Sequence, residues 1–112
     1  MELLEEIGNL RNDLNISIKN LRVSGGKWAK AQHDYRVALA KRELELRSDK
    51  YPATLTYDIA RGDERIAELK QEETNTYVIY DANQRAIDSI KLQLRLLENQ
   101  LAREYGNTRN EV

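Results

Sequence analysis

The second half of the chain carries a heptad repeat of mostly apolar residues. Its members follow one another at alternating steps of three and four positions: Ile66, Leu69, Glu73, Thr76, Tyr80, Asn83, Ile87, Ile90, Leu94, Leu97 and Leu101. A stripe with this spacing is typical of the contact seam of a coiled coil. The pattern therefore predicts one long helix over residues 63–104, with polar side chains at Glu73, Thr76 and Asn83 in the middle of its seam.

The first half repeats the period less strictly. One stripe contains Leu3, Ile7, Leu10, Leu14, Ser17, Leu21, Ser24, Trp28, Ala31, Tyr35 and Ala38. After Ala38 the stripe moves to Leu39 and Leu46, which is a slip in the heptad phase. Gly25 and Gly26 are adjacent, and two glycines inside a helix cost about 2 kcal/mol relative to alanines. This half therefore predicts two helices, over residues 2–23 and 27–48, with a kink or break between them.

The stretch "LRSDKYPATLTYDIARGDERI" contains the strongest stop and start signals of the chain. A proline disfavours helix in the residue before it, so the preceding helix should end near Ser48. A short helix over residues 53–61 follows, with Pro52 in its first turn, Gly62 as a left-handed cap and Asp63 capping the last helix. Leu55, Ile59 and Ala60 are expected to close the open end of a hairpin.

The tripeptide Arg61, Gly62, Asp63 matches a cell-adhesion motif. Each of the three residues has a local role at the helix ends, so we interpret the match as structural. The expected corner of the fold consists of Pro52, Leu55, Ile59, Arg61, Gly62 and Asp63.

The composition supports an all-α fold. Charged residues make up 33% of the 112 residues, and the chain contains one proline and no phenylalanine. We expect an elongated antiparallel helical hairpin or coiled coil, formed by residues 1–106 as a single domain. Gly106 is expected to cap the last helix, with residues 107–112 forming a frayed tail. Because two helices share only one seam, self-association into a helical bundle should cover the remaining apolar residues.

The charges are distributed unevenly although the net charge is only −1. Residues 27–50 contain seven basic and four acidic side chains, whereas residues 63–75 contain two basic and five acidic ones. In a hairpin the two blocks lie opposite each other, and such exposed pairs favour one register more than they add stability. The expected pairs join Lys27, Lys30, Arg36, Lys41, Arg42 and Arg47 with Asp63, Glu64, Glu68, Glu72 and Glu73.

Few residues of the chain favour catalysis or metal binding. There is no cysteine, and His33, the only histidine, has no partner at the spacing of a helical metal site. We therefore expect no enzymatic activity, no metal and no cofactor. The acidic start and the lack of a long apolar run predict neither a signal peptide nor a membrane span, which favours the cytoplasm.

The segment "YRVALAKRELELRSDKYPATLTYDIARGDERIAELK" and the helix "YVIYDANQRAIDSIKLQLRLLENQLAREY" together resemble a group of small, uncharacterised helical proteins. Phages and prophages of Gram-positive bacteria encode this group, in which a Pro-x-Thr-Leu corner and an Ala-Arg-Gly step precede a long amphipathic helix. The resemblance implies no catalytic motif. It implies a shared corner and a setting in the bacterial host cytoplasm, near replication and recombination functions.

These observations favour a non-catalytic protein that acts through contacts with itself and with a phage or host protein. Tyr77, Tyr80, Glu73 and Thr76 are the predicted partner-binding residues, because tyrosine is favoured at interfaces. The predicted self-association residues are Ile87, Ile90, Leu94, Leu97 and Leu101. Nucleic-acid binding through the basic block and Trp28 is a less favoured alternative, and inhibition of a host enzyme or defence protein is another.

Overall fold

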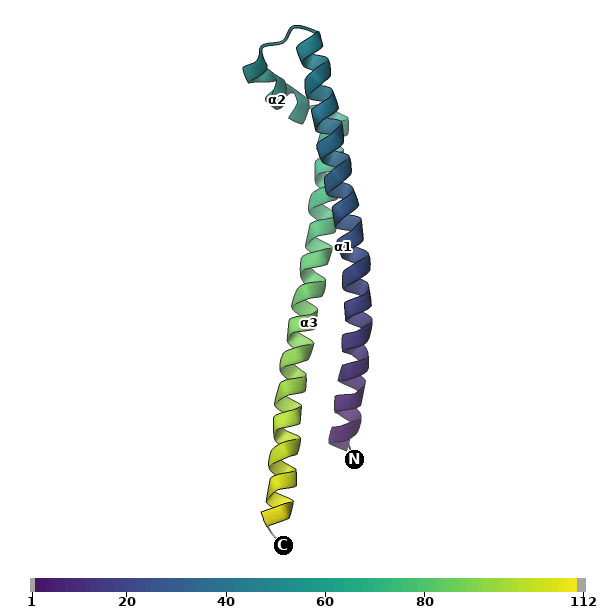
Figure 1. The fold of residues 1–112 in the computed structure, drawn as a ribbon, viewed down its shortest axis with the longest axis vertical. Helices are drawn as coiled ribbons and strands as arrows, with labels where there is room; N and C mark the ends of the chain where they lie inside the picture. The colour runs from purple at the N-terminus through teal and green to yellow at the C-terminus, as the bar shows by residue number, and fades with distance from the viewer. Residues whose placement is uncertain (1, 111–112) are drawn as a thin grey trace. The chain divides into compact units, whose positions relative to one another are not determined.

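The computed structural model describes residues 2–110, and three α-helices account for nearly all of them (Figure 1). α1 spans Glu2–Ser48, α2 spans Ala53–Arg61 and α3 spans Glu64–Asn110. The described residues contain no strand. The predicted all-α class is therefore confirmed.

The described chain divides into two compact units. Unit 1 contains residues 2–22 and 81–110, and unit 2 contains Val23–Tyr80. In unit 1 an ion pair of 3.0 Å joins Arg11 of α1 to Glu98 of α3, and in unit 2 Arg42 of α1 approaches Asp63 at the start of α3. The predicted antiparallel hairpin is thus confirmed within each unit, whereas the single domain over residues 1–106 stays a prediction.

The predicted seams match the burial of the side chains. Every heptad position named for α3, from Ile66 to Leu101, is buried or half-buried, and so is every position of the first stripe from Leu3 to Ala38. Unit 1 is held by aliphatic residues, of which Ile7, Ile87 and Leu94 are fully buried. The heptad period alone therefore identified the residues that face the neighbouring helix.

The seam of unit 2 is more polar than that of unit 1. Ser24 and Thr76 are buried there beside Ala31, with Leu46 and Ile66 buried near the corner. The Thr76 hydroxyl donates to the backbone carbonyls of Glu72 and Glu73, each at 2.9 Å. Because this hydroxyl finds its acceptors within its own helix, its burial does not require a polar partner on α1.

The predicted break at Gly25 and Gly26 is wrong, because α1 continues through both residues. A Cβ atom at Gly25 would lie 3.3 Å from Cε2 of Tyr80, whereas nothing lies within 4 Å of a Cβ at Gly26. Gly25 therefore lets the Tyr80 ring approach the backbone of α1. Packing along the seam outweighs the low helix propensity of the two glycines, since tertiary contacts provide most of the stability of a protein helix.

We expect Gly26→Ala to raise the free energy of unfolding by about 1 kcal/mol, because its methyl group enters open space in a helix interior. Gly25→Ala should gain less or lose stability, since Tyr80 must move by a few tenths of an ångström. Urea denaturation of the two single variants, followed by circular dichroism, measures the difference. Equal gains would contradict the close approach of Tyr80.

The end of α1 is a Schellman motif. The N–H of Tyr51 donates to the carbonyl of Leu46 at 3.1 Å, and the N–H of Lys50 donates to that of Arg47 at 3.0 Å. Lys50 is the only non-glycine residue of the described chain with a positive φ, at 66°. The helix end that Pro52 signals is therefore made by Lys50. This left-handed residue lies one position before Tyr51, the residue that precedes the proline.

Lys50→Gly should stabilise the protein, because the left-handed region costs a residue with a Cβ about 1 to 2 kcal/mol. Part of this gain is lost, since glycine also increases the conformational entropy of the unfolded chain. We expect a net rise of about 0.5 to 1 kcal/mol in the free energy of unfolding. Lys50→Ala is the matched control in thermal denaturation, because it removes the charge but keeps the Cβ, and it should not reproduce the rise.

The second half of the corner follows the prediction in part. Oδ1 of Asp63 accepts hydrogen bonds from the N–H groups of Arg65 at 3.0 Å and Ile66 at 3.4 Å, so Asp63 caps α3 as expected. Pro52 occupies the N-cap of α2 and not its first turn. Gly62 is right-handed, with φ of −81° and ψ of −8°, so the predicted left-handed cap is wrong. The N–H groups of Gly62 and Asp63 bond back to α2 carbonyls, and this tight turn needs no positive φ.

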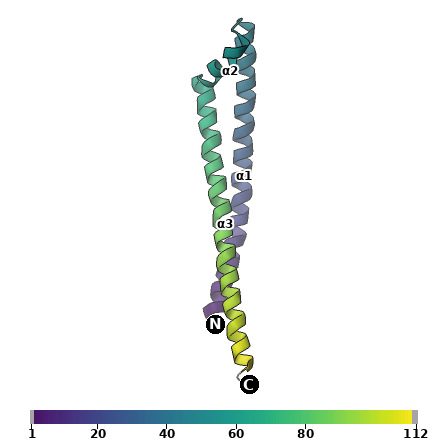
Figure 2. The ribbon, with the colours of Figure 1, turned by 90° about the vertical axis from the view of Figure 1, so that its left-hand side faces the viewer.

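The face of α2 that packs inward differs in part from the predicted one, which contained Leu55, Ile59 and Ala60. Thr56 and Ala60 are buried, whereas Leu55 and Ile59 are exposed. Both inward residues are small, and the Thr56 hydroxyl donates to the carbonyl of Ala53 at 3.0 Å. Figure 2 shows α2 between the end of α1 and the start of α3. The small inward side chains of Thr56 and Ala60 permit a close approach there. The prediction that Leu55 and Ile59 close the hairpin is therefore wrong.

α3 also continues further than predicted. It runs through Gly106 to Asn110, so the predicted end at residue 104 and the cap at Gly106 are wrong. One glycine costs a helix only about 1 kcal/mol, and Gly106 does not adopt the left-handed torsions that end a helix. Residues 107–110 belong to α3, and residues 111–112 of the predicted tail lie outside the described part.

The predicted ion pairs between the basic and acidic blocks are mostly absent. Among the described residues, only Arg42 and Asp63 join the two blocks, with 3.5 Å between Nε and Oδ2. Lys30 pairs with Asp34 and Lys70 with Glu73, in each case within one helix. Neighbours on the same helix are closer than partners across the seam, so the blocks add little to the register.

Candidate interaction surface

Three aromatic rings meet in unit 2. The ring of Trp28 from α1 stacks on Tyr80 from α3, with centroids 5.3 Å apart and planes at 24°. Trp28 also meets Tyr77 in a tilted arrangement, with centroids 5.1 Å apart and planes at 57°. The absent side chain of Gly25 makes room for Tyr80. We call Trp28, Tyr77 and Tyr80 the aromatic cluster.

The four predicted partner-binding residues differ in their accessibility. Tyr77 is 45% exposed and lies at the solvent side of the aromatic cluster. Tyr80 is half-buried beneath Trp28, and Thr76 is buried in the seam. Glu73 is half-buried and its carboxylate pairs with Lys70 at 3.1 Å. Of this set, Tyr77 presents the largest accessible apolar surface.

The five predicted self-association residues lie in the seam of unit 1. Ile87 and Leu94 are buried, and Ile90, Leu97 and Leu101 are half-buried. They pack against the first helix of their own chain and not on an outer face. Ile87 and Leu94 are therefore not accessible to another molecule, whereas Leu97 also lines a groove beside the seam.

Large apolar side chains remain exposed outside the seam. On α3 these include Tyr77, Val78, Ile79, Leu92 and Leu96, at the corner Tyr51, Leu55, Tyr57 and Ile59, and on α1 Leu4, Ile16, Ile18, Val23, Val37 and Leu44. Leu92 and Leu96 are four residues apart, so they share one helix face. We call the α3 set the outer apolar residues. The heptad indicated them indirectly, as apolar residues without a place in the seam.

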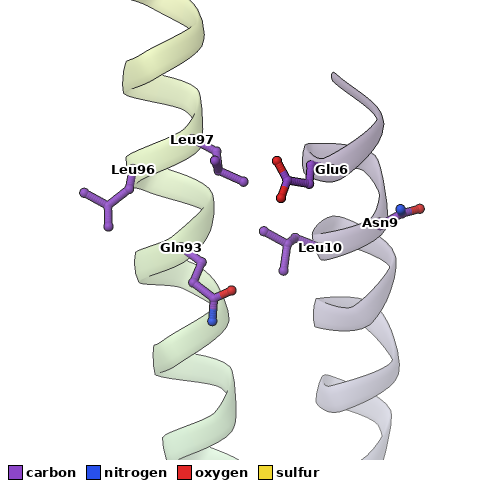
Figure 3. A pocket seen from close by; sticks show the side chains of 6 residues that line it. All are labelled: Glu6, Asn9, Leu10, Gln93, Leu96 and Leu97. Atoms are coloured by element: carbon purple, nitrogen blue, oxygen red, sulfur yellow. The ribbon is translucent and has the colours of Figure 1, made fainter. Parts of the chain in front are cut away.

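One side of unit 1 contains an acidic groove between its helices. Figure 3 shows Glu6 and Leu10 of α1 pointing toward Gln93 and Leu97 of α3, with Leu96 at the outer side of α3. This part of the groove has a volume of about 340 Å³. A contiguous hollow of about 500 Å³ shares Glu6 and is lined by Glu2, Leu3, Gln100 and Glu104. The Gln100 amide donates to the Glu104 carboxylate at 3.2 Å.

Unit 2 contains a basic groove of about 390 Å³. Val37, Ala38 and Leu69 supply its apolar side chains. Lys41 and Arg65 supply two cations, and His33 supplies an imidazole ring. Asp34 also lines it, but its carboxylate accepts a hydrogen bond from Lys30 at 2.9 Å. This bond lowers the pKa of Asp34, so its small stabilising effect is present at neutral pH and is lost as the pH falls through the lowered pKa.

Neither groove was predicted from the sequence. Their charged lining residues occupy heptad positions beside the seam, where helices usually present charged and polar groups. The available signal was the sign of these charges, which is acidic at Glu2 and Glu6 and basic at Lys41 and Arg65. The heptad alone does not show whether such residues border a groove.

The described residues contain no cluster of histidine, cysteine and carboxylate side chains that could hold a metal ion. Nor does any helix among them combine the length and apolar character that crossing a membrane requires.

Comparisons with known proteins identified no relative: no family model, no curated protein and no solved structure matches the chain.

Proposed function

We propose that this chain is a non-catalytic helical protein that acts through protein–protein contacts. The observation that supports the proposal best is the exposure of the outer apolar residues, together with the use of both seams within the chain. Tyr77, Val78 and Ile79 form a consecutive run on α3, and Leu92 and Leu96 extend the apolar surface of unit 1. Exposed apolar side chains also lie on α1 and α2, and those that adjoin one another, as Leu92 and Leu96 do, are characteristic of interaction sites.

The proposed setting is a phage or prophage of a Gram-positive bacterium, with a phage or host protein as partner. The resemblance of the corner and of the last helix to phage and prophage proteins supports this setting. Inhibition of a host enzyme is a special case of the same proposal, because occlusion of a site also needs only an exposed helical face.

Direct nucleic-acid binding has less support. Single strands bind to aromatic rings whose faces are accessible for stacking. Trp28 is half-buried and contacts both Tyr77 and Tyr80, while the ammonium group of Lys70 lies 5.1 Å from the centroid of the Tyr35 ring. The rings of the basic block therefore pack within the protein.

The proposal is tested with two variants. Val78→Ser and Ile79→Ser together remove outer apolar residues, whereas Lys30→Glu, Arg36→Glu and Lys41→Glu reverse the basic block. We expect the apolar variant to lose a protein that the parent chain retains from host cytoplasm, as identified by mass spectrometry. The charge-reversed variant should retain that protein.

A gel-shift titration with single- and double-stranded DNA and with RNA tests the alternative function, nucleic-acid binding. Tight, salt-sensitive binding by the parent chain that disappears in the charge-reversed variant would favour the nucleic-acid function. Circular dichroism of each variant confirms that its helices are retained.

A further inference from the structure

The two grooves have similar construction and opposite charge. Leu3, Leu10 and Leu97 line the acidic groove of unit 1, and Glu2, Glu6 and Glu104 stand beside them. Val37, Ala38 and Leu69 line the basic groove of unit 2, beside His33, Lys41 and Arg65. Each groove therefore joins an apolar surface to charges of one dominant sign.

The charge of the basic groove is not neutralised by its own carboxylates. Asp34 forms an ion pair with Lys30, and Asp63 forms one with Arg42 of α1. No ion pair joins Lys41 or Arg65 to a carboxylate in the described part of unit 2. A neighbouring recess is lined by Lys27 and Lys30 together with Asp34 and Glu72, so its lining adds no net charge.

We propose that the acidic groove of one copy of this chain binds the basic groove of a second copy. The inference rests on the proposed function, because it assigns a partner to a protein that acts through protein contacts. Opposite charges beside apolar surfaces favour one pairing and oppose the two like-charged pairings. A second copy contains both kinds of groove, so each groove can meet its opposite charge on another molecule of the same chain.

Leu96, which is 57% exposed at the side of the acidic groove, is among the apolar side chains that this contact covers.

Charge reversal tests the pairing directly. The acidic-groove variant is Glu2→Lys with Glu6→Lys, and the basic-groove variant is Lys41→Glu with Arg65→Glu. We expect the parent chain to form a dimer at tens of micromolar in sedimentation velocity, and each variant to dimerise roughly 100-fold more weakly. An equimolar mixture of the two variants should form a one-to-one dimer, because each then meets its complement.

Two further variants serve as controls. Glu5→Lys with Asp88→Lys changes the charge of unit 1 by the same amount outside the groove, and Arg36→Glu with Arg47→Glu does so in unit 2. Both should dimerise like the parent chain. A chain with all four groove reversals should also dimerise, since both of its grooves have exchanged their signs.

Cysteine cross-linking provides a measurement that does not depend on charge reversal. Because the chain has no cysteine, Glu6→Cys and Lys41→Cys each introduce a single thiol. After oxidation of an equimolar mixture, mass spectrometry should find the 6–41 disulfide in excess over 6–6 and 41–41. This arm remains informative if a reversed variant fails to fold.

Two outcomes would overturn the inference. One is a parent chain that remains monomeric at about 100 μM in low salt, and the other is a dimer whose cross-links join like grooves. If the parent chain is monomeric but still retains a host protein through Val78 and Ile79, the pairing is refuted and the proposed function stands. If it forms the expected dimer but retains no other protein, the partner is a second copy alone.

Discussion

Leu46→Ala is expected to lower the free energy of unfolding by about 2 to 5 kcal/mol, the largest loss among the single substitutions considered. Leu46 is only 2% exposed, and it packs in unit 2 at the end of α1. Its carbonyl also accepts the Tyr51 N–H bond of the Schellman motif. The substitution leaves a cavity beside this turn, and a small helical protein has few other buried side chains to compensate.

Urea denaturation followed by circular dichroism measures this loss, and hydrogen exchange shows whether the amides of unit 2 lose protection. Leu44→Ala is the matched control, because Leu44 lies two residues earlier on the same helix and is 63% exposed. The control should change the stability by less than about 0.5 kcal/mol. Similar losses in the two variants would contradict the inward position of Leu46.

The second large effect is expected for Trp28→Ala, which removes the central ring of the aromatic cluster. Truncation of a tryptophan costs about 3 to 5 kcal/mol when its ring is fully buried, so the half-buried Trp28 should be near 3 kcal/mol. Part of this loss comes from the ring contacts with Tyr77 and Tyr80, since an aromatic pair contributes about 0.5 to 1.5 kcal/mol beyond its buried area.

Trp28→Phe should recover part of the lost stability, because it restores a ring to the stack. Near-ultraviolet circular dichroism gives a second readout, since Trp28 is the only tryptophan of the chain. Tyr57→Ala serves as a control for the loss of an exposed aromatic ring outside the cluster. An unchanged tyrosine signal in Trp28→Ala would show that the three rings do not interact.

The helices and their inward faces follow from the heptad because burial of an apolar stripe is the main source of helix stability in proteins. The same periodicity located Trp28 and Tyr80 on facing stripes. It did not predict their stacking, which depends on the space that Gly25 leaves on the opposite helix. Glycine has a low helix propensity, so local sequence rules count Gly25 as destabilising. In the structure its missing side chain is what lets Tyr80 pack against α1.

The corner was predicted less completely than the seams. Capping by Asp63 depends on one side chain and its own helix, so the sequence is sufficient for it. The orientation of α2 depends instead on how closely three helices can approach one another. This geometry selects the small residues Thr56 and Ala60 for the inward face and leaves Leu55 outside. Apolar character alone therefore indicated the inward face only in part.

Of the four predicted partner-binding residues, only Tyr77 is exposed. The grooves depend on which charged residues are brought together from two helices, and the heptad does not provide their side-chain positions. Most of the predicted ion pairs between the charge blocks were wrong for a related reason, since Lys30 and Lys70 pair within their own helices.

The corner also determines the order in which the chain folds. Arg42 and Asp63, which meet in unit 2, are separated by 21 positions, whereas Arg11 and Glu98 of unit 1 are 87 positions apart. Loop-closure entropy makes the longer connection costlier by about 1 kcal/mol if the chain between the pairs is still unfolded. Once unit 2 has formed, most of that connection is already ordered. We therefore expect the helices to join first beside α2 and to close toward the chain ends, so that unit 1 is the last part to form and the first to open.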